Sequence, residues 1–146
     1  MEKKMIIGMA SDHAGFELKE YIKKELFSMG YDVKDYGTHS EESVDYPDYA
    51  HPLASDISDG KLRIGILICG TGNGISMTAN KHRNVRCALC WEPEIARLAR
   101  QHNDANVLAM PGRFISKEKA LESVKVFLDT DFEGGRHQRR VDKINL

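Results

Sequence analysis

The sequence lacks the features of several large classes of protein. No apolar run is long enough to span a membrane, and no small-residue cleavage site follows the N-terminus. The 21 basic and 22 acidic residues give a formal net charge of -1, whereas a general nucleic-acid binder carries an excess of positive charge. We therefore expect a cytoplasmic protein that binds neither membranes nor nucleic acid.

Cysteine is scarce and odd in number. Three cysteines do not suit a secreted disulfide framework and favour reduced thiols that are either packed or reactive. Cys87 and Cys90 have the C-x-x-C spacing of some redox and zinc sites, but residues three apart on a strand face opposite sides of a sheet. They are therefore predicted to be core thiols. Since the histidines form no H-E-x-x-H or comparable cluster, we expect no metal site.

The chain has no internal repeat or low-complexity segment, so we expect one domain over residues 1–146. This length can bury a core without disulfides or a cofactor. Short apolar runs alternate with amphipathic stretches, which predicts an α/β fold with a five-stranded, mostly parallel sheet. The expected strands are 5–10, 31–36, 64–68, 85–90 and 107–110. The expected helices run from Phe16 to Gly30, from the end of the turn-rich segment 37–48 to about Ser58, from the glycine loop at 70–74 onward, and over 92–101 and 116–128.

The run at 64–68 is apolar throughout, as in a strand covered on both faces, and it ends at Cys69. Ligands of open α/β sheets bind at the carboxyl ends of strands. The glycines that follow, Gly70, Gly72 and Gly74, allow backbone N–H groups to approach an anion, and such surroundings lower the pKa of a thiol. Cys69 is thus a candidate general base or nucleophile. A buried cysteine before a tightly packed glycine turn explains the same residues, and both interpretations stay open.

A nucleotide-binding module is an alternative for this loop. Its spacing, however, is G-x-G-x-G and not the G-x-G-x-x-G of dinucleotide sites, and it follows the third strand, not the first. Glu92, at the end of the next strand, stands where a ribose ligand would be sought. A Walker loop is excluded because no Gly-Lys-Ser/Thr follows.

Three more polar residues follow strands and should share the edge with Cys69. Asp12 and His13 come after the first strand, where Asp12 can orient a sugar hydroxyl and His13 can bind phosphate. Asp12, or Ser11 before it, can instead be the N-cap of the next helix. Arg113 follows the fifth strand and is either an anion contact or a solvated charge.

The tail at 129–146 lacks a strong apolar stripe, so we expect an arm that packs on something else, such as a second subunit. Arg136 and Arg140 are four apart. On a helix they share one face and can clamp a phosphate. The alternative is that the two arginines lie on a solvated face and pair with Glu133 or Asp142.

His102 and Asn103 end a helix that returns to the amino edge of the sheet. They should therefore lie far from Cys69 of their own subunit, and if they act, they act across a dimer interface. His102 can equally be a helix C-terminal residue favoured by the helix dipole.

Read together, these segments resemble the type B ribose-5-phosphate isomerase family, which also contains allose-6-phosphate and galactose-6-phosphate isomerases. The matching segments cover nearly the whole chain in order: Ser11–Gly15, Ser43–Tyr49, Ile68–Ser76, Ala79–Lys81, Ala99–Leu108 and Glu133–Val141. The resemblance implies a flavodoxin-like or Rossmann-like α/β/α sandwich, a homodimer or a tetramer of dimers with shared sites, and no metal or organic cofactor.

The resemblance also implies the reaction and its residues. The family interconverts ribose 5-phosphate and ribulose 5-phosphate through an enediolate, in the non-oxidative pentose phosphate pathway. Cys69 matches the base that takes the proton from C2, and Thr71 matches the residue that moves protons between the two oxygens. N–H groups from Gly70 to Gly74 would stabilise the enediolate. His102 matches the residue that opens the furanose ring.

The remaining matches concern substrate binding. Asn103 would hold sugar hydroxyls, Asp12 and Tyr46 would lie near the sugar, and the phosphate contacts would be His13, Arg113, Arg136 and Arg140. Residue 73 varies in the family, so Asn73 is a binding residue whose side-chain role is undefined. Cys69 together with Thr71 places the sequence in the cysteine branch. Allose 6-phosphate and galactose 6-phosphate, the latter with the chain as one subunit of a pair, are alternative substrates.

Overall fold

The computed structural model describes residues 5–145. Residues 1–4, where no cleavage site was found, and Leu146, the last residue of the tail, lie outside the described residues. The strands are β1 (Ile6–Ser11), β2 (Asp32–Asp35), β3 (Ile64–Cys69), β4 (Cys87–Leu89) and β5 (Val107–Pro111). The helices are α1 (Phe16–Ser28), α2 (Tyr46–Ser58), α3 (Asn73–Ala79), α4 (Pro93–Asn103), α5 (Lys117–Asp129) and α6 (Arg136–Ile144).

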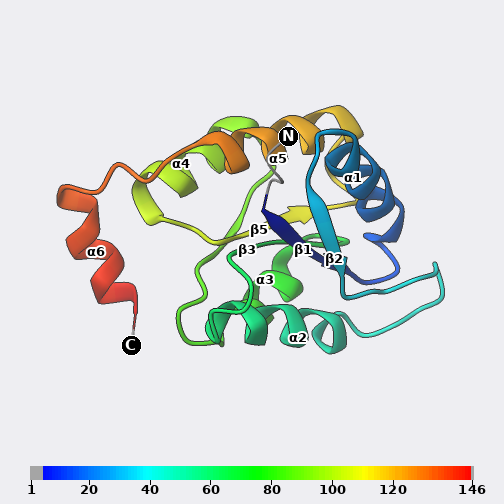
Figure 1. Ribbon diagram of the computed structural model, residues 1–146. Helices are drawn as coiled ribbons and strands as arrows, with labels where there is room; N and C mark the ends of the chain where they lie inside the picture. The colour runs from blue at the N-terminus through cyan, green and yellow to red at the C-terminus, as the bar shows by residue number, and fades with distance from the viewer. Residues whose placement is uncertain (1–4, 146) are drawn as a thin grey trace.

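The five strands form one sheet in the order β2-β1-β3-β5-β4, and every pair is parallel. This confirms the predicted α/β class. The order differs from the flavodoxin order 2-1-3-4-5 only in the exchange of the last two strands. Because parallel crossovers are right-handed, α1 and α4 cover one face and α2 and α3 cover the other. Figure 1 shows the three layers, with α5 beside α1 and α4.

The core lies on both faces of β3, whose six residues are all buried, as the continuous apolar run predicted. One apolar cluster includes Ile66, Phe127 and Cys90 under α1, α4 and α5. The other includes Leu67 under α2 and α3, and Cys87 packs against it. The two thiols of the C-x-x-C pair therefore face opposite sides of the sheet, as predicted.

Several predicted boundaries are too long, and two have clear physical causes. The strand expected over 85–90 is only Cys87–Leu89, because Arg86 N donates to the Asn106 side chain at 2.8 Å and not to a backbone carbonyl of β5. The Asn80 side chain binds the open edge of this strand: Asn80 Nδ2 donates to Cys87 O at 3.0 Å, and Cys87 N donates to Asn80 Oδ1 at 2.8 Å. The turn-rich segment ends before Asp48, because Pro47 suits the first turn of a helix and α2 begins at Tyr46.

The tail is an arm, as predicted, and most of it is helical. Helix α6 contacts α4, buries His137 and Val141, and exposes most of its remaining residues. Figure 1 shows α6 standing at one side of the sandwich, apart from the sheet. Within residues 5–145, no helix is both long and apolar enough to cross a membrane.

A buried ion pair fixes the end of β2. The ammonium of Lys19, on α1, is fully buried and lies 2.9 and 2.7 Å from the two carboxylate oxygens of Asp35. Lys23 also binds Asp35 at 2.9 Å, and Gly37 N donates to the same carboxylate. Desolvation opposes ionisation of Asp35, but these hydrogen bonds outweigh it and hold its pKa below the usual value.

We predict that Asp35→Asn lowers the free energy of unfolding by about 3 kcal/mol at pH 7, because the buried Lys19 ammonium loses its two short bonds to a carboxylate and keeps, within residues 5–145, only Glu20 Oε2, 3.6 Å away. Since the folded pKa of Asp35 is depressed, its contribution is complete above the unfolded pKa and is lost as the pH falls through the folded pKa. The difference from the wild type should therefore narrow below about pH 4. Urea unfolding from pH 7 to pH 3 measures both effects.

Asp131→Asn, at an exposed position, is the matched control and should change stability by no more than about 0.5 kcal/mol. Equal stability of Asp35→Asn and the wild type at pH 7 would show that Asp35 is not the stabilising counter-charge of Lys19.

Candidate active site at the carboxyl edge

The carboxyl ends of β1, β3 and β5 lie side by side in the middle of the sheet. The chain leaves β1 toward the β2 edge through α1, and it leaves β3 toward the β4 edge through α3, on the opposite face. Such a reversal of direction opens a crevice outside the strand ends, where ligands of α/β sheets bind. The loops after these three strands carry most of the predicted site residues.

The turn after β1 rests on the end of β3. Asp12 N donates to Ile68 O at 3.3 Å, and Gly15 lies so close to the Ile68 carbonyl that a Cβ atom would overlap it. Asp12 Oδ1 accepts from Ala14 N at 2.9 Å and from Gly15 N at 3.1 Å, so Asp12 caps the turn before α1. Within residues 5–145 no hydrogen bond uses Asp12 Oδ2, which therefore stays able to bind a hydroxyl.

His13 is oriented by the loop before α2. Val44 N donates to His13 Nδ1 at 3.1 Å. Because Nδ1 accepts this bond, the proton of the neutral ring must be on Nε2. His13 therefore presents an N–H donor from the same turn that holds Asp12, as a phosphate contact requires.

The glycine loop after β3 is shaped by close contacts. Gly72 has φ +78°, and a Cβ atom there would overlap the Leu89 side chain. Gly74 lies against the ring of Tyr46, which is how the start of α2 reaches this loop. Asn73 N donates to Thr71 Oγ1 at 3.3 Å. Thr71 and Asn73 are exposed beside the loop.

Cys69 is joined to the loop after β5 by backbone hydrogen bonds. Gly112 N donates to Cys69 O at 2.8 Å, and Arg113 N donates to Gly70 O at 3.0 Å. The Arg113 guanidinium lies beside Gly70, since a Cβ atom at Gly70 would be 3.4 Å from Nη1. The Cys69 residue itself is 4% exposed. The structure thus brings Cys69, the glycine loop and Arg113 together.

A pocket of about 370 Å³ lies beside this loop. Its lining residues are Thr71, Asn73, Leu89, Trp91, Pro111 and Phe114. Pro111 pairs with Cys69 in the sheet, so the pocket adjoins the end of β3. The sequence reasoning missed the apolar part of this lining, because exposed aromatic residues such as Trp91 and Phe114 carry no local motif.

The other two cysteines are core thiols. Burial raises the pKa of both Cys87 and Cys90 to about 12. At neutral pH both are therefore thiols, which are weak nucleophiles, and this supports their prediction as core residues.

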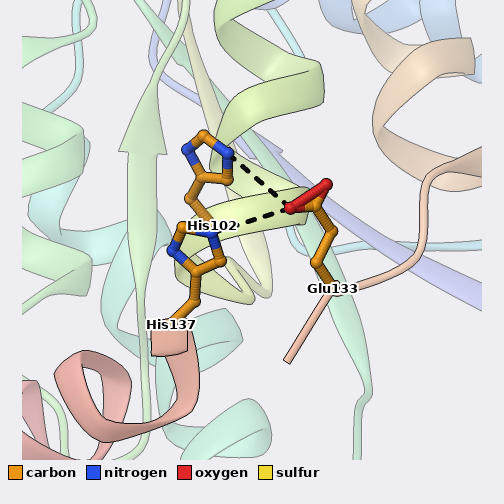
Figure 2. Close-up of side chains that lie close together, drawn as sticks. All are labelled: His102, Glu133 and His137. Atoms are coloured by element: carbon orange, nitrogen blue, oxygen red, sulfur yellow. Dashed lines mark ion pairs between the residues drawn. The ribbon is translucent and has the colours of Figure 1, made fainter. Parts of the chain in front are cut away.

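A second group of polar side chains lies at the opposite edge of the sheet. His102 and Asn103 end α4, which runs two residues past the helix expected over 92–101. Asn103 lines a larger pocket of about 620 Å³ that shares no lining residue with the pocket beside Cys69. Figure 2 shows the Glu133 carboxylate beside the rings of His102 and His137, with dashed lines to both. Glu133 Oε1 lies 3.9 Å from His102 Nε2 and 3.6 Å from His137 Nε2.

The sequence reasoning missed the grouping of Glu133 and His137 with His102. The rings of His102 and His137 stack, with centroids 4.3 Å apart and planes 14° from parallel. Desolvation, together with the nearby charges of His102 and Arg136, holds the pKa of His137 below its ordinary value. No spacing rule links residues more than 30 positions apart, so only the docking of α6 on α4 reveals the cluster.

Arg136 and Arg140 both lie on α6, four residues apart, so they share one face of a helix as expected. Both arginines are exposed, as the alternative of a solvated face expected, but within residues 5–145 neither pairs with Glu133 or Asp142. Glu133 faces the two histidines, and Asp142 accepts from Gln138 Nε2 at 2.8 Å. In the part of the chain that the structure describes, both guanidiniums are exposed and form no hydrogen bond or ion pair.

A family model described as ribose/galactose isomerase matches residues 7–144. The chain belongs to this family. It is 48% identical to ribose-5-phosphate isomerase B of Escherichia coli K12, over 94% of this chain and 93% of that protein. The crystal structure of a ribose 5-phosphate isomerase from Thermotoga maritima is 54% identical and superposes with a TM-score of 0.94, covering 96% and 97% of the two chains.

A third relative was solved with a bound sugar phosphate. Ribose-5-phosphate isomerase B of Mycoplasma genitalium, with bound ribulose-5-phosphate, is 43% identical, has a TM-score of 0.92, and covers 98% of this chain and 95% of its own. These comparisons confirm the family and the fold that the sequence motifs predicted.

We predict that Cys87 and Cys90 resist alkylation in the folded protein. A pKa of about 12 leaves about one thiol in 10⁴ ionised at pH 8. After treatment with iodoacetamide at pH 8, peptide mass spectrometry should find both unmodified, whereas all three cysteines should react in urea. Labelling of either residue at the same rate with and without urea would show that burial does not suppress its ionisation.

Proposed function

We propose that the protein interconverts D-ribose 5-phosphate and D-ribulose 5-phosphate, with Cys69 as the base. The observation that carries the proposal is the place of Cys69 in the chain: it ends the buried strand β3, the glycine loop begins at the next residue, and the Arg113 guanidinium lies beside Gly70. The bound ribulose-5-phosphate in the Mycoplasma genitalium relative supports the choice of substrate. We also place the protein in the cytoplasm, because its three cysteines are free thiols.

The reaction moves one proton between neighbouring carbons. Cys69, as the thiolate, takes the proton from C2 of the open-chain aldose, which gives an enediolate, and the resulting thiol returns a proton to C1. Thr71 passes a proton between O1 and O2. The thiolate alone is not enough, because a C–H beside a carbonyl is a weak acid and the enediolate must also be stabilised.

The glycine loop supplies that stabilisation. The first N–H groups of a helix have no partner within it, and α3 begins directly after Gly72. The N–H of Asn73 is held by Thr71 Oγ1, and we assign the other N–H groups between Gly70 and Gly74 to the developing oxyanion. Side chains at the glycines would block the approach of the ligand to these groups.

The phosphate contacts come from two places. His13 Nε2–H and Arg113 belong to the edge that carries Cys69, whereas Arg136 and Arg140 lie on α6 at the far side. We propose that Arg136 of the partner subunit and Arg140 of the partner subunit complete the phosphate site. The support is that both guanidiniums lack any counter-charge within residues 5–145, and a dianionic phosphate would supply one.

We also propose that His102 of the partner subunit and Asn103 of the partner subunit lie beside the sugar, because both residues end α4 at the edge of the sheet opposite to Cys69 of their own chain. His102 would open the furanose ring, and Asn103 and Asp12 Oδ2 would hold hydroxyls, with Tyr46 packed near the sugar. A two-fold dimer would then contain two such sites. We propose that the isomerisation uses no metal or organic cofactor, because the thiol and the loop donors provide the base and the oxyanion site.

Allose 6-phosphate and galactose 6-phosphate are the alternative substrates, because the family model itself names galactose. These sugars share the reacting atoms with ribose 5-phosphate and differ mainly in the length between C1 and the phosphate. Turnover of the three sugar phosphates by one preparation decides between them, and ribose 5-phosphate should have the highest kcat/KM.

We predict that Cys69→Ala lowers kcat for ketose formation from ribose 5-phosphate by about 10²–10⁴-fold in the presence of a chelator, because it removes the base. KM should change much less, since the phosphate contacts remain. Cys90→Ala, which removes a buried thiol on the other face of the sheet, directly after β4, is the matched control and should stay active. Full activity of Cys69→Ala would disprove its role.

We predict that inactive Cys69→Ala and His102→Ala subunits regain activity when they are mixed. Each mixed dimer would contain one site with both changes and one with neither, so random exchange should restore about a quarter of the wild-type activity. Native mass spectrometry verifies the exchange. If exchange is complete and no activity returns, the two residues do not share a site.

A further inference from the structure

We propose that His102, Glu133 and His137 form a binding site for a divalent transition-metal ion of the zinc type, and that the ion inhibits the enzyme by occupying His102. The binding part stands on the geometry of the cluster alone. The inhibition part rests on the proposed function, in which His102 opens the sugar ring.

The three side chains supply ligand atoms at nearly the required spacing. Each offers one atom, and these atoms all lie within 4.8 Å of one another. Tetrahedral zinc with bonds of about 2.0–2.1 Å places neighbouring ligands about 3.3–3.4 Å apart. The two distances to Glu133 Oε1, 3.9 Å and 3.6 Å, exceed this by only a few tenths of an ångström. Two imidazoles and one carboxylate also leave a fourth position open for water.

The backbone holds Glu133 at this place. Glu133 N donates to Gln101 O at 3.0 Å, which attaches the connector before α6 to the last turn of α4, next to His102. Gly134 and Gly135 follow with φ of +69° and +56°, a turn that other residues rarely adopt. This turn connects Glu133 to the start of α6, and Figure 2 shows the His137 ring close to the Glu133 carboxylate. The cluster is therefore largely preformed.

Metal binding requires one rearrangement. The lone pair of an imidazole nitrogen lies in the plane of the ring. Two nearly parallel rings therefore cannot both direct a lone pair at one ion beside them, so one ring must tilt. The side chain of His137 is only 11% exposed and is held by packing, whereas that of His102 is 40% exposed at the end of α4. His102 is therefore the ring that moves. The guanidiniums of Arg136 and Arg140 oppose a cation, and the Glu133 carboxylate offsets part of that repulsion.

An ion at this place would stop ring opening. A histidine nitrogen that coordinates a metal has its lone pair in the bond and cannot accept a proton from the sugar. Inhibition by the metal should therefore be reversed by a chelator. The inhibition should be strongest for the opening of the furanose ring, which is the step assigned to His102.

The test is calorimetric titration of the chelator-treated enzyme with zinc chloride, together with inhibition assays. We expect one zinc ion per chain, and Glu133→Gln should weaken binding by at least about tenfold, since even outer-shell changes cost that much. Each chelator-treated enzyme is also assayed with added zinc. The zinc concentration that halves the activity should be higher for Glu133→Gln than for the wild type. Glu118→Gln, an exposed change at the start of α5, is the matched control and should behave as the wild type.

Two rival zinc sites have their own controls. Cys69→Ala tests binding to the thiol, and His51→Gln tests the exposed pair in which His51 Nδ1 lies 2.7 Å from His82 Nε2. Both variants should keep the binding of the wild type, while His137→Gln should lose it. The proposal is overturned if the wild type binds no zinc, if Glu133→Gln binds it equally well, or if only a rival variant loses it.

The calorimetric result does not depend on turnover. Zinc binding without inhibition would overturn the inhibition part alone. A protein that binds zinc at this cluster and yet isomerises no sugar phosphate would instead count against the proposed function.

Discussion

The contact between the turn after β1 and the end of β3 is the constraint on which the site depends. Gly15 has no side chain, so its backbone can lie directly on the Ile68 carbonyl, and Asp12 N can reach Ile68 O. The loop after β5 is joined to the same place through Cys69 O and Gly70 O. Three loops that are distant in sequence thus form one hydrogen-bonded unit. Main-chain bonds therefore fix the position of Cys69, and side-chain rotamers contribute little.

Environment decides what each of the three cysteines can do. Cys87 and Cys90 are held as neutral thiols by burial, one on each face of the sheet. Cys69 is also buried, but it ends its strand beside a glycine loop and a guanidinium. Its position at the start of the glycine loop is what distinguishes it from the two core thiols, and on this position the proposed role of Cys69 as the base depends.

The candidate site residues lie at two edges of the sheet. The edge with Cys69 holds His13 and Arg113, and the opposite edge holds His102, Asn103 and the α6 arginines, so the proposed site needs residues from two chains. Both α6 arginines lack a partner in the described part of the chain, which costs little in water and leaves them ready to bind an anion. The same helix brings His137 to Glu133. The arm is thus the segment through which catalysis and the inferred metal site become linked.

The sequence by itself determined what depends on near neighbours along the chain. Apolar runs and their periods gave the strands and helices to within a few residues, and the strand-end rule grouped Asp12, His13, Cys69 and Arg113 correctly. Only the tertiary structure decided the order of β5 and β4, the pairing of Lys19 with Asp35, the capping of the β4 edge by Asn80, and the meeting of Glu133 with His102. Each of these contacts either joins residues far apart in the chain or has an alternative that the local sequence allows equally well. Such contacts form when whole layers pack, and no spacing of residue types encodes them.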